Sequence, residues 1–310
     1  MAVRADAGPT PPAPAASAPT IVALAAGDRD ARESVAIGPN GEAYVGDGKG
    51  AWVRTRAGGI AGDVARATRA GTGGPNGAGA VVGIDGGPPY RLDKAGTWQM
   101  VVLGLHAKAV LGRGPRATAA FGKHVFDLEK PEPGKLADAP GNVAMLGAGA
   151  SGVVAQTDKG LVKLATKGAP KWKPIAKAPP PVIAIVDDRW ALVDRGMWNL
   201  DAGTLVAWPQ GFRVATVSSL GDSIIAAGSI GANAELVTIS GKASTLAHAP
   251  IGVKLAAPIV SITGDKVGRV VIVARDGSLA VRDKANAWTA ANVSDQLPAD
   301  KPGSPPAESQ

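Results

Sequence analysis

Cysteine is absent from this 310-residue sequence, and aromatic residues make up only 4% of it. Without cysteine there is no disulfide scaffold, no thiolate zinc site and no cysteine nucleophile. No apolar run approaches the roughly 20 residues that a membrane-spanning helix needs. The remaining composition, 45% hydrophobic and 19% charged, is typical of a globular protein. We therefore expect a folded domain whose hydrophobic core is held by packing alone.

Proline and alanine dominate both ends of the chain. This composition, without hydrophobic periodicity, predicts a disordered linker at residues 1–19 and a disordered tail at 298–310, around a folded domain at 20–297. No signal-peptide pattern is present. One hypothesis is that Met1 begins a mature form whose export signal has been removed, with the linker as a membrane tether. The alternative is a cytoplasmic protein with an irregular end.

A short turn with Asp or Gly recurs between apolar runs. The turns begin at residues 47, 85, 122, 158, 194, 231 and 276. Five of the six steps are 36–38 residues long, and the last is 45. A second turn, Gly-Pro-Asn-Gly at 38–41, recurs 36 residues later at 74–77. Regular spacing of this kind indicates a repeat architecture.

The segments between these turns are four to six residues long and rich in Val, Ile and Leu, which is typical of strands. Four tryptophans follow further turns at equivalent places: Trp98, Trp172, Trp208 and Trp288. Four strands in each of seven units predict an all-β fold, a single seven-bladed β-propeller of four-stranded antiparallel blades, with six or eight blades as alternatives. The Asp-Gly turns should join second to third strands, and the Gly-Pro-Asn-Gly turns first to second. Residues 20–25 should close the ring by pairing with the last unit.

Four segments resemble repeats of known bacterial β-propellers. Val270–Ala291, Gly152–Ala176 and Trp190–Trp208 are similar to repeats of quinoprotein-type and outer-membrane assembly propellers, and Gly38–Arg56 resembles those of sensor propellers. The resemblance covers residues 34–291. It implies the propeller fold and no specific family or activity, because its motifs are general to the fold.

The net charge of +7 is concentrated in residues 108–177, which hold twelve basic and five acidic side chains. This basic sector predicts attraction of an anionic partner, and the alternative is an ordinary solvated surface. We expect no nucleic acid partner, because few aromatic side chains are available to stack on bases.

Motifs of catalysis and cofactor binding are weak. Gly147, Gly149 and Gly152 match a dinucleotide-binding pattern, but a strand follows them where a helix is required. The three histidines, His106, His124 and His248, lack metal-ligand spacing. The sequence therefore predicts no catalytic residue, no cofactor and no metal ligand.

Four acidic residues follow the first strands of their units: Asp187, Asp188, Asp222 and Asp265. In propeller hydrolases such residues bind calcium or act as acid and base near the axis. The preferred interpretation is that they cap turns by accepting hydrogen bonds from backbone N–H groups.

A partner-binding set is predicted from one irregular aromatic pair and from the basic sector. Trp190 and Trp198 flank a turn beside Arg189 and Arg195, where they are expected to form a sugar- or peptide-binding patch. The whole predicted set is Arg189, Trp190, Arg195, Trp198, Arg113 and Lys123.

The leading functional hypothesis is a non-catalytic, monomeric scaffold of the bacterial cell envelope or secreted space, located in the periplasm, at the outer membrane or outside the cell. It would recognise a protein or polysaccharide partner. The alternative is a propeller hydrolase or lyase with an axial divalent cation held by Asp222 and Asp265. An electron-transfer quinoprotein is a weaker third hypothesis.

Overall fold

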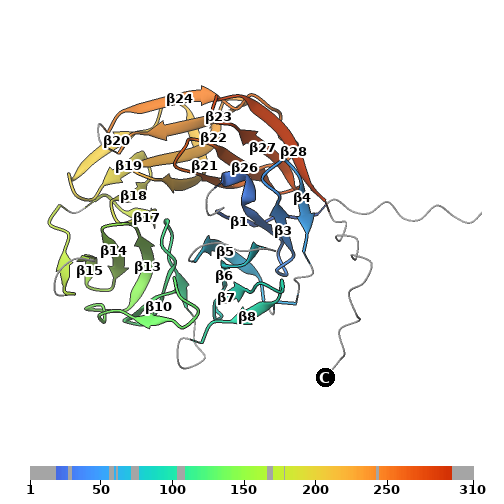
Figure 1. Ribbon diagram of the computed structural model, residues 1–310. Helices are drawn as coiled ribbons and strands as arrows, with labels where there is room; N and C mark the ends of the chain where they lie inside the picture. Colours follow the sequence, from blue (N-terminus) through green and yellow to red (C-terminus); the bar gives the residue numbers. More distant parts are fainter. Residues whose placement is uncertain are drawn as a thin grey trace, which may run out of the picture.

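The computed structural model describes residues 19–26, 30–55, 59–60, 62–70, 77–102, 109–165, 170–177, 179–241 and 244–294. The predicted linker and tail lie outside these residues, apart from Pro19. Within them, 28 β-strands and one short 3-10 helix, η1 (Ala31–Glu33), are arranged around a central axis (Figure 1). No helix in the described residues is long and apolar enough to cross a membrane.

Five four-stranded antiparallel sheets, here called blades, follow one another along the chain. The first consists of β5 (Val64–Arg69), β6 (Ala80–Ile84), β7 (Tyr90–Leu92) and β8 (Trp98–Met100). The second consists of β9 (Val110–Leu111), β10 (Thr118–Phe121), β11 (His124–Asp127) and β12 (Gly134–Lys135). The third consists of β13 (Val143–Ala148), β14 (Gly152–Thr157), β15 (Gly160–Ala165) and β16 (Trp172–Pro174). The fourth consists of β17 (Val182–Ile185), β18 (Trp190–Val193), β19 (Gly196–Asn199) and β20 (Thr204–Ala207). The fifth consists of β21 (Phe212–Leu220), β22 (Ser223–Ile230), β23 (Asn233–Ile239) and β24 (Leu246–Pro250).

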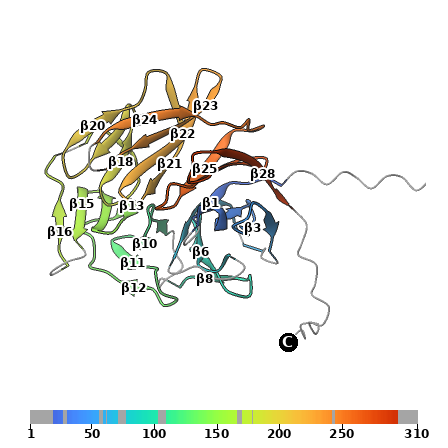
Figure 2. The same ribbon diagram turned by 45° about the horizontal axis from the view of Figure 1, so that its top comes forward.

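The remaining strands form one eight-stranded sheet, which joins the two ends of the described chain. One half consists of β1 (Ala23–Ala25), β2 (Val35–Ile37), β3 (Ala43–Gly46) and β4 (Trp52–Arg54). The other half consists of β25 (Ile259–Gly264), β26 (Val270–Ala274), β27 (Ser278–Arg282) and β28 (Trp288–Ser294). The halves meet where β28 pairs in parallel with β4, Val293 opposite Trp52 and Ser294 opposite Val53. Figure 1 shows β4 beside β28, and Figure 2 shows β28 next to the first strands of the chain.

The predicted number of blades is therefore wrong. The structure has five four-stranded blades, not seven, and not the six or eight of the alternatives. The difference arises because the outermost strands β4 and β28 pair edge to edge, so eight strands become one continuous sheet. An all-β propeller of antiparallel, four-stranded blades is otherwise found.

Ring closure also differs from the prediction. Residues 23–25 form β1, which pairs with β2 and not with a strand of the last unit. The only backbone hydrogen bond described from residues 20–25 to that unit runs from the Ile21 N–H to the Arg275 carbonyl, at 2.8 Å. Closure depends instead on β4 and β28, and this pairing removes two exposed sheet edges.

The recurring turns occupy the predicted hairpins in all units except the first. Those beginning at residues 85, 122, 158, 194, 231 and 276 join second to third strands. In the last of them Gly277 has φ +80°, a conformation that favours glycine. The turn at Asp47 joins β3 to β4, and the turn at 38–41 joins β2 to β3, because β1 adds a strand before them. Residues 74–76 of the second Gly-Pro-Asn-Gly turn lie outside the described residues.

The core is divided among the interfaces around the ring. In the described residues, seven clusters of buried hydrophobic side chains each lie between neighbouring blades or halves of the eight-stranded sheet. Trp98 begins β8 and Trp172 begins β16, and each indole N–H donates to a carbonyl of the preceding unit, Gly41 at 2.7 Å and Ala137 at 2.9 Å. These two tryptophans connect neighbouring units.

Candidate functional site

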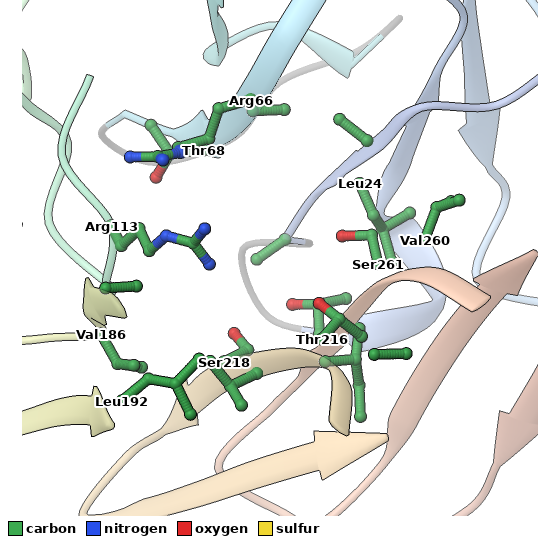
Figure 3. Close-up of a pocket in the computed structure, with 18 of the residues that line it drawn as sticks. Leu24, Arg66, Thr68, Arg113, Val186, Leu192, Thr216, Ser218, Val260 and Ser261 are labelled. Atoms are coloured by element: carbon green, nitrogen blue, oxygen red, sulfur yellow. The ribbon is translucent and has the colours of Figure 1, made fainter. Parts of the chain in front are cut away.

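An axial cavity of about 420 Å³ lies where the inner strands converge. Its described walls come from β1, β5, β17, β21 and β25, from Leu192 of β18, and from Arg113 and Gly114, which follow β9. Figure 3 shows these elements surrounding one space, with the Arg113 guanidinium directed into it. A volume of this size falls within the range of small-molecule sites, roughly 300–1,000 Å³.

A β-bulge is shared by five inner strands of the ring, and four of them line the cavity. Strands β5, β13, β17, β21 and β25 each carry one extra residue relative to the next strand. The extra residues are Ala65, Ala144, Ile183, Ala215 and Val260. A bulge bends its strand and redirects the neighbouring side chain. Arg66, Thr216 and Ser261 each follow a bulged residue and line the cavity.

Arg66 and Arg113 are the charged groups of the described cavity wall, and each is held in place locally. Arg66 donates from an Nη atom to the Leu111 carbonyl at 2.9 Å. The backbone of Arg113 bridges two blades: its N–H donates to the Leu146 carbonyl at 3.0 Å, and its carbonyl accepts from Ala148 N–H at 2.8 Å. Because both hydrogen bonds hold the backbone, the Cα atom of Arg113 has a defined position in the cavity wall.

The electrostatics of this wall are unbalanced. Burial lowers the pKa of Arg66, and burial together with the positive charge of Arg66 lowers the pKa of Arg113 to about 10. Both side chains remain charged at neutral pH. The described lining residues include no Asp or Glu, and Arg113 Nε has no hydrogen-bond partner among the described residues. The cavity thus presents positive charge that the described fold does not neutralise.

Hydroxyl and aliphatic side chains complete the cavity wall. Thr216 and Ser218 are two residues apart on β21, which places them on the same face of the strand. Figure 3 shows them, with Ser261, across the space from Arg66 and Thr68. The aliphatic part of the wall includes Leu24, Ile183, Val186, Leu192, Val214 and Val260. Arginines, hydroxyls and aliphatic groups are suited to binding an anionic group attached to an apolar body.

The predicted aromatic pair is not brought together. Trp190 pairs with Asn199 across β18 and β19, and Ala191 pairs with Trp198, so the two indoles lie on opposite faces of the blade. Trp190 is 1% exposed within the cluster between the fourth and fifth blades. Trp198 is half-buried and packs against the cluster between the third and fourth. The Trp190 indole is therefore not available on the surface of this structure.

The remaining predicted partner-binding residues are dispersed. Arg189 is half-buried and lies 3.4 Å from the Asp222 carboxylate, Arg195 is exposed in a turn, and Lys123 is exposed with its Nζ 3.9 Å from Asp138. Arg113 alone of the predicted set lines the axial cavity. Arg66 also lines the cavity. It was not predicted, because nothing in the sequence indicates the bulge that redirects its side chain.

Three of the four candidate acidic residues accept hydrogen bonds from backbone N–H groups, in line with the preferred interpretation. Asp187 accepts from the N–H groups of Arg189 and Trp190 at 2.8 and 2.9 Å, and Asp188 accepts from the Ser151 N–H and hydroxyl. Asp222 is exposed beside Arg189. Asp265 accepts from Val267 N–H at 3.0 Å and from the Arg269 guanidinium.

Asp187 is unusual among them, because the pKa of its buried carboxyl is raised. Burial raises its pKa to about 6, and the Asp188 carboxylate adds to this effect, although the backbone hydrogen bond from Arg189 opposes it. An unfolded Asp titrates near 3.9, so the folded state keeps its proton to a higher pH. The stability contribution is therefore favourable at low pH and decreases as the pH rises from about 4 to 6.

Replacement of Asp187 by Asn should remove this decrease, because the amide oxygen can still accept both backbone hydrogen bonds. We expect the variant to be more stable than the wild type at pH 7, by about 1–3 kcal/mol, and equal to it near pH 4. Urea unfolding at several pH values from 4 to 7 measures this. A variant that is less stable than the wild type at pH 7 would contradict the assignment.

Comparison with solved structures finds β-propellers. PorZ, described as an essential bacterial surface component of the type-IX secretion system of Porphyromonas gingivalis, has a TM-score of 0.56 at 14% identity over 90% of this chain and 39% of that chain. YCF48 from Cyanidioschyzon merolae has a TM-score of 0.53 at 14% identity, over 88% of this chain and 98% of that one. The WD40 propeller domain of Doa1 has a TM-score of 0.56 at 12% identity, over 88% of this chain and 96% of that one.

These likenesses establish the class of the protein. The chain is a β-propeller, and its fold is similar to propellers of different origins. The chain spans about two fifths of the length of PorZ. No protein-family model matches the sequence, and no curated protein matches it significantly. The likeness to these structures therefore shows the β-propeller fold alone.

Proposed function

We propose that this protein is a non-catalytic binding propeller of the bacterial cell envelope or secreted space, which holds a protein or polysaccharide partner at its axial cavity. The cavity carries the proposal: it is large enough for a ligand, and its wall combines arginines, hydroxyls and aliphatic side chains. Such groups bind and orient a partner. Each inner strand that carries them is paired with the next strand of its own sheet.

The location in the proposal has two supports. The solved structure of PorZ, to which this fold is similar over 90% of the chain, is described as a bacterial surface component. The proline- and alanine-rich residues 1–19 have the composition of a flexible tether. Both features fit a propeller displayed at or beyond the cell envelope.

The alternative of a hydrolase or lyase with an axial divalent cation has no support in the described geometry. Asp222 and Asp265 are not among the residues that line the cavity. In the described chain, no three His, Cys, Asp or Glu side chains gather to hold a metal ion. The positive charges of Arg66 and Arg113 would also repel a cation on the axis. We therefore propose binding alone.

Site-directed photo-crosslinking in intact cells tests the proposal. A photoreactive residue replaces Ser218 on the cavity wall, or Lys284 in the exposed turn between β27 and β28 as a matched control. We expect a discrete protein or polysaccharide adduct at position 218, recovered from the envelope or the medium, and none at position 284. Equal adducts at both positions, or recovery of the protein from the cytosol, would contradict the proposed function.

A further inference from the structure

The arrangement of Arg66 and Arg113 indicates the chemistry of the ligand. The two guanidinium groups come from different blades, β5 and the segment after β9, and line the same cavity (Figure 3). Like charges in a partly buried space repel each other, and burial adds to the cost of each. Two such arginines are retained at a net cost to the folded state unless something neutralises them.

The described protein does not supply that neutralisation. Neither arginine forms an ion pair with any residue in the described part of the chain, where the ion pairs involve other groups. The Arg66 guanidinium donates to a neutral carbonyl, and Arg113 Nε has no partner there. The wall opposite contributes hydroxyl groups, which can donate further hydrogen bonds to an anion.

The Arg66 side chain and the Arg113 backbone are also held in place before binding. Arg66 follows the bulge of β5 and is fixed by its bond to Leu111, and the Arg113 backbone is clamped between two blades. A guanidinium presents its N–H groups in a planar fork that matches two oxygens of a carboxylate or phosphate. Groups held in place before binding lose little conformational entropy when the ligand arrives.

We propose that Arg66 and Arg113 bind an oxyanion, a carboxylate or a phosphate, of the ligand that enters the axial cavity. The hydroxyls of Thr216, Ser218 and Ser261 complete the polar contacts, and the aliphatic wall accommodates the apolar part of the ligand. This inference rests on the proposed function, because it names the chemical group that the binding site recognises.

Isothermal titration calorimetry of the full chain tests the inference, with inorganic phosphate and succinate as probes in chloride buffer at constant ionic strength. Arg113→Gln removes one guanidinium from the cavity, and Arg213→Gln, at an exposed site outside it, removes the same charge. We expect saturable 1:1 binding of at least one probe by the wild type. The Kd should rise at least tenfold in Arg113→Gln and stay within twofold in Arg213→Gln. The stronger probe distinguishes a phosphate group from a carboxylate.

The outcomes distinguish a failure of the oxyanion site from a failure of the proposed binding function. Arg113→Gln removes a repelled charge, so its Tm without ligand should equal or exceed that of the wild type, which shows that lost binding is not lost folding. No saturable binding of either probe, or equal Kd changes in the two variants, would overturn the oxyanion site. If Arg113→Gln still forms the position-218 adduct, the binding function stands and only the oxyanion assignment fails.

Discussion

Replacement of Asp265 by alanine is expected to destabilise the protein by ~3–5 kcal/mol and to lower the Tm by about 10 °C. The Asp265 side chain is only 6% exposed and accepts hydrogen bonds from Ala31 N–H at 3.1 Å and from Arg269 Nε at 2.5 Å. Arg269 in turn lies 2.7 Å from Asp30. These contacts join η1 to the β25–β26 turn, so the variant loses a charged link between the two ends of the chain.

Thermal unfolding followed by circular dichroism measures this effect. Asp93→Ala is the matched control, because Asp93 also caps a turn but accepts only from its own exposed loop, from Ala95 and Thr97 N–H and from the Gln99 side chain. Its loss should cost about 1 kcal/mol. Equal losses of stability in the two variants would show that the contacts of Asp265 with Arg269 and Ala31 contribute no more than the capping of an ordinary turn.

Acid should weaken the same link. Burial alone would raise the pKa of Asp30, but hydrogen bonds from Arg32 and the charges of Arg269 and Arg32 outweigh it, so the pKa is lowered. Its stabilising contribution is therefore present above the unfolded Asp value near 4 and is lost as the pH falls below it. Asp187 acts in the opposite sense at higher pH, because its contribution decreases as the pH rises from about 4 to 6.

Replacement of Trp190 by alanine is expected to cost ~3–5 kcal/mol, the range for removing a large buried aromatic side chain. The indole is 1% exposed among residues that include Val186, Met197 and Phe212. The substitution leaves a cavity that this rigid interface cannot fill by relaxation. Loss of stability is thus predicted, without a specific loss of surface binding.

Urea unfolding compares this variant with Trp198→Ala, which removes the same side chain from the opposite, half-buried face of the blade. We expect the Trp198 variant to lose less than half as much stability, because less of its surface is removed from water. A Trp190 variant with nearly wild-type stability but no partner binding would restore the aromatic patch that the sequence suggested.

The sequence predicted those parts of the fold that depend on local chemistry. Turns such as those at Asp158 and Asp276 were located correctly, because a Gly in a hairpin turn between two β-branched runs is a strong local signal. In the first unit the predicted strand order was wrong by one strand. The cause is that η1 separates β1 from β2, and no repeated turn indicates this connection. The β4–β28 pairing was missed because it joins opposite ends of the chain, and this error changed the number of blades.

The site was less predictable than the fold. Arg113 was selected as part of a basic sector, and the structure places it in the axial cavity for a different reason, its backbone bridge between two blades. Arg66 was overlooked because residues 64–69 give no indication of an extra residue in the strand. Trp190 and Trp198 are close in the sequence, on either side of one turn. The pairing of β18 with β19 places their side chains on opposite faces of the blade.

The shared bulges of the inner strands have an evolutionary consequence. Residues such as Arg66, Thr216 and Ser261 reach the axis from strands whose pairing with β6, β22 and β26 continues on both sides of each bulge. Under the proposed function, a point mutation at Thr216 or Ser261 would change what the axis recognises while the pairing of its strand stays intact. Ligand preference could then diverge by single substitutions at these positions, without passing through unstable intermediates.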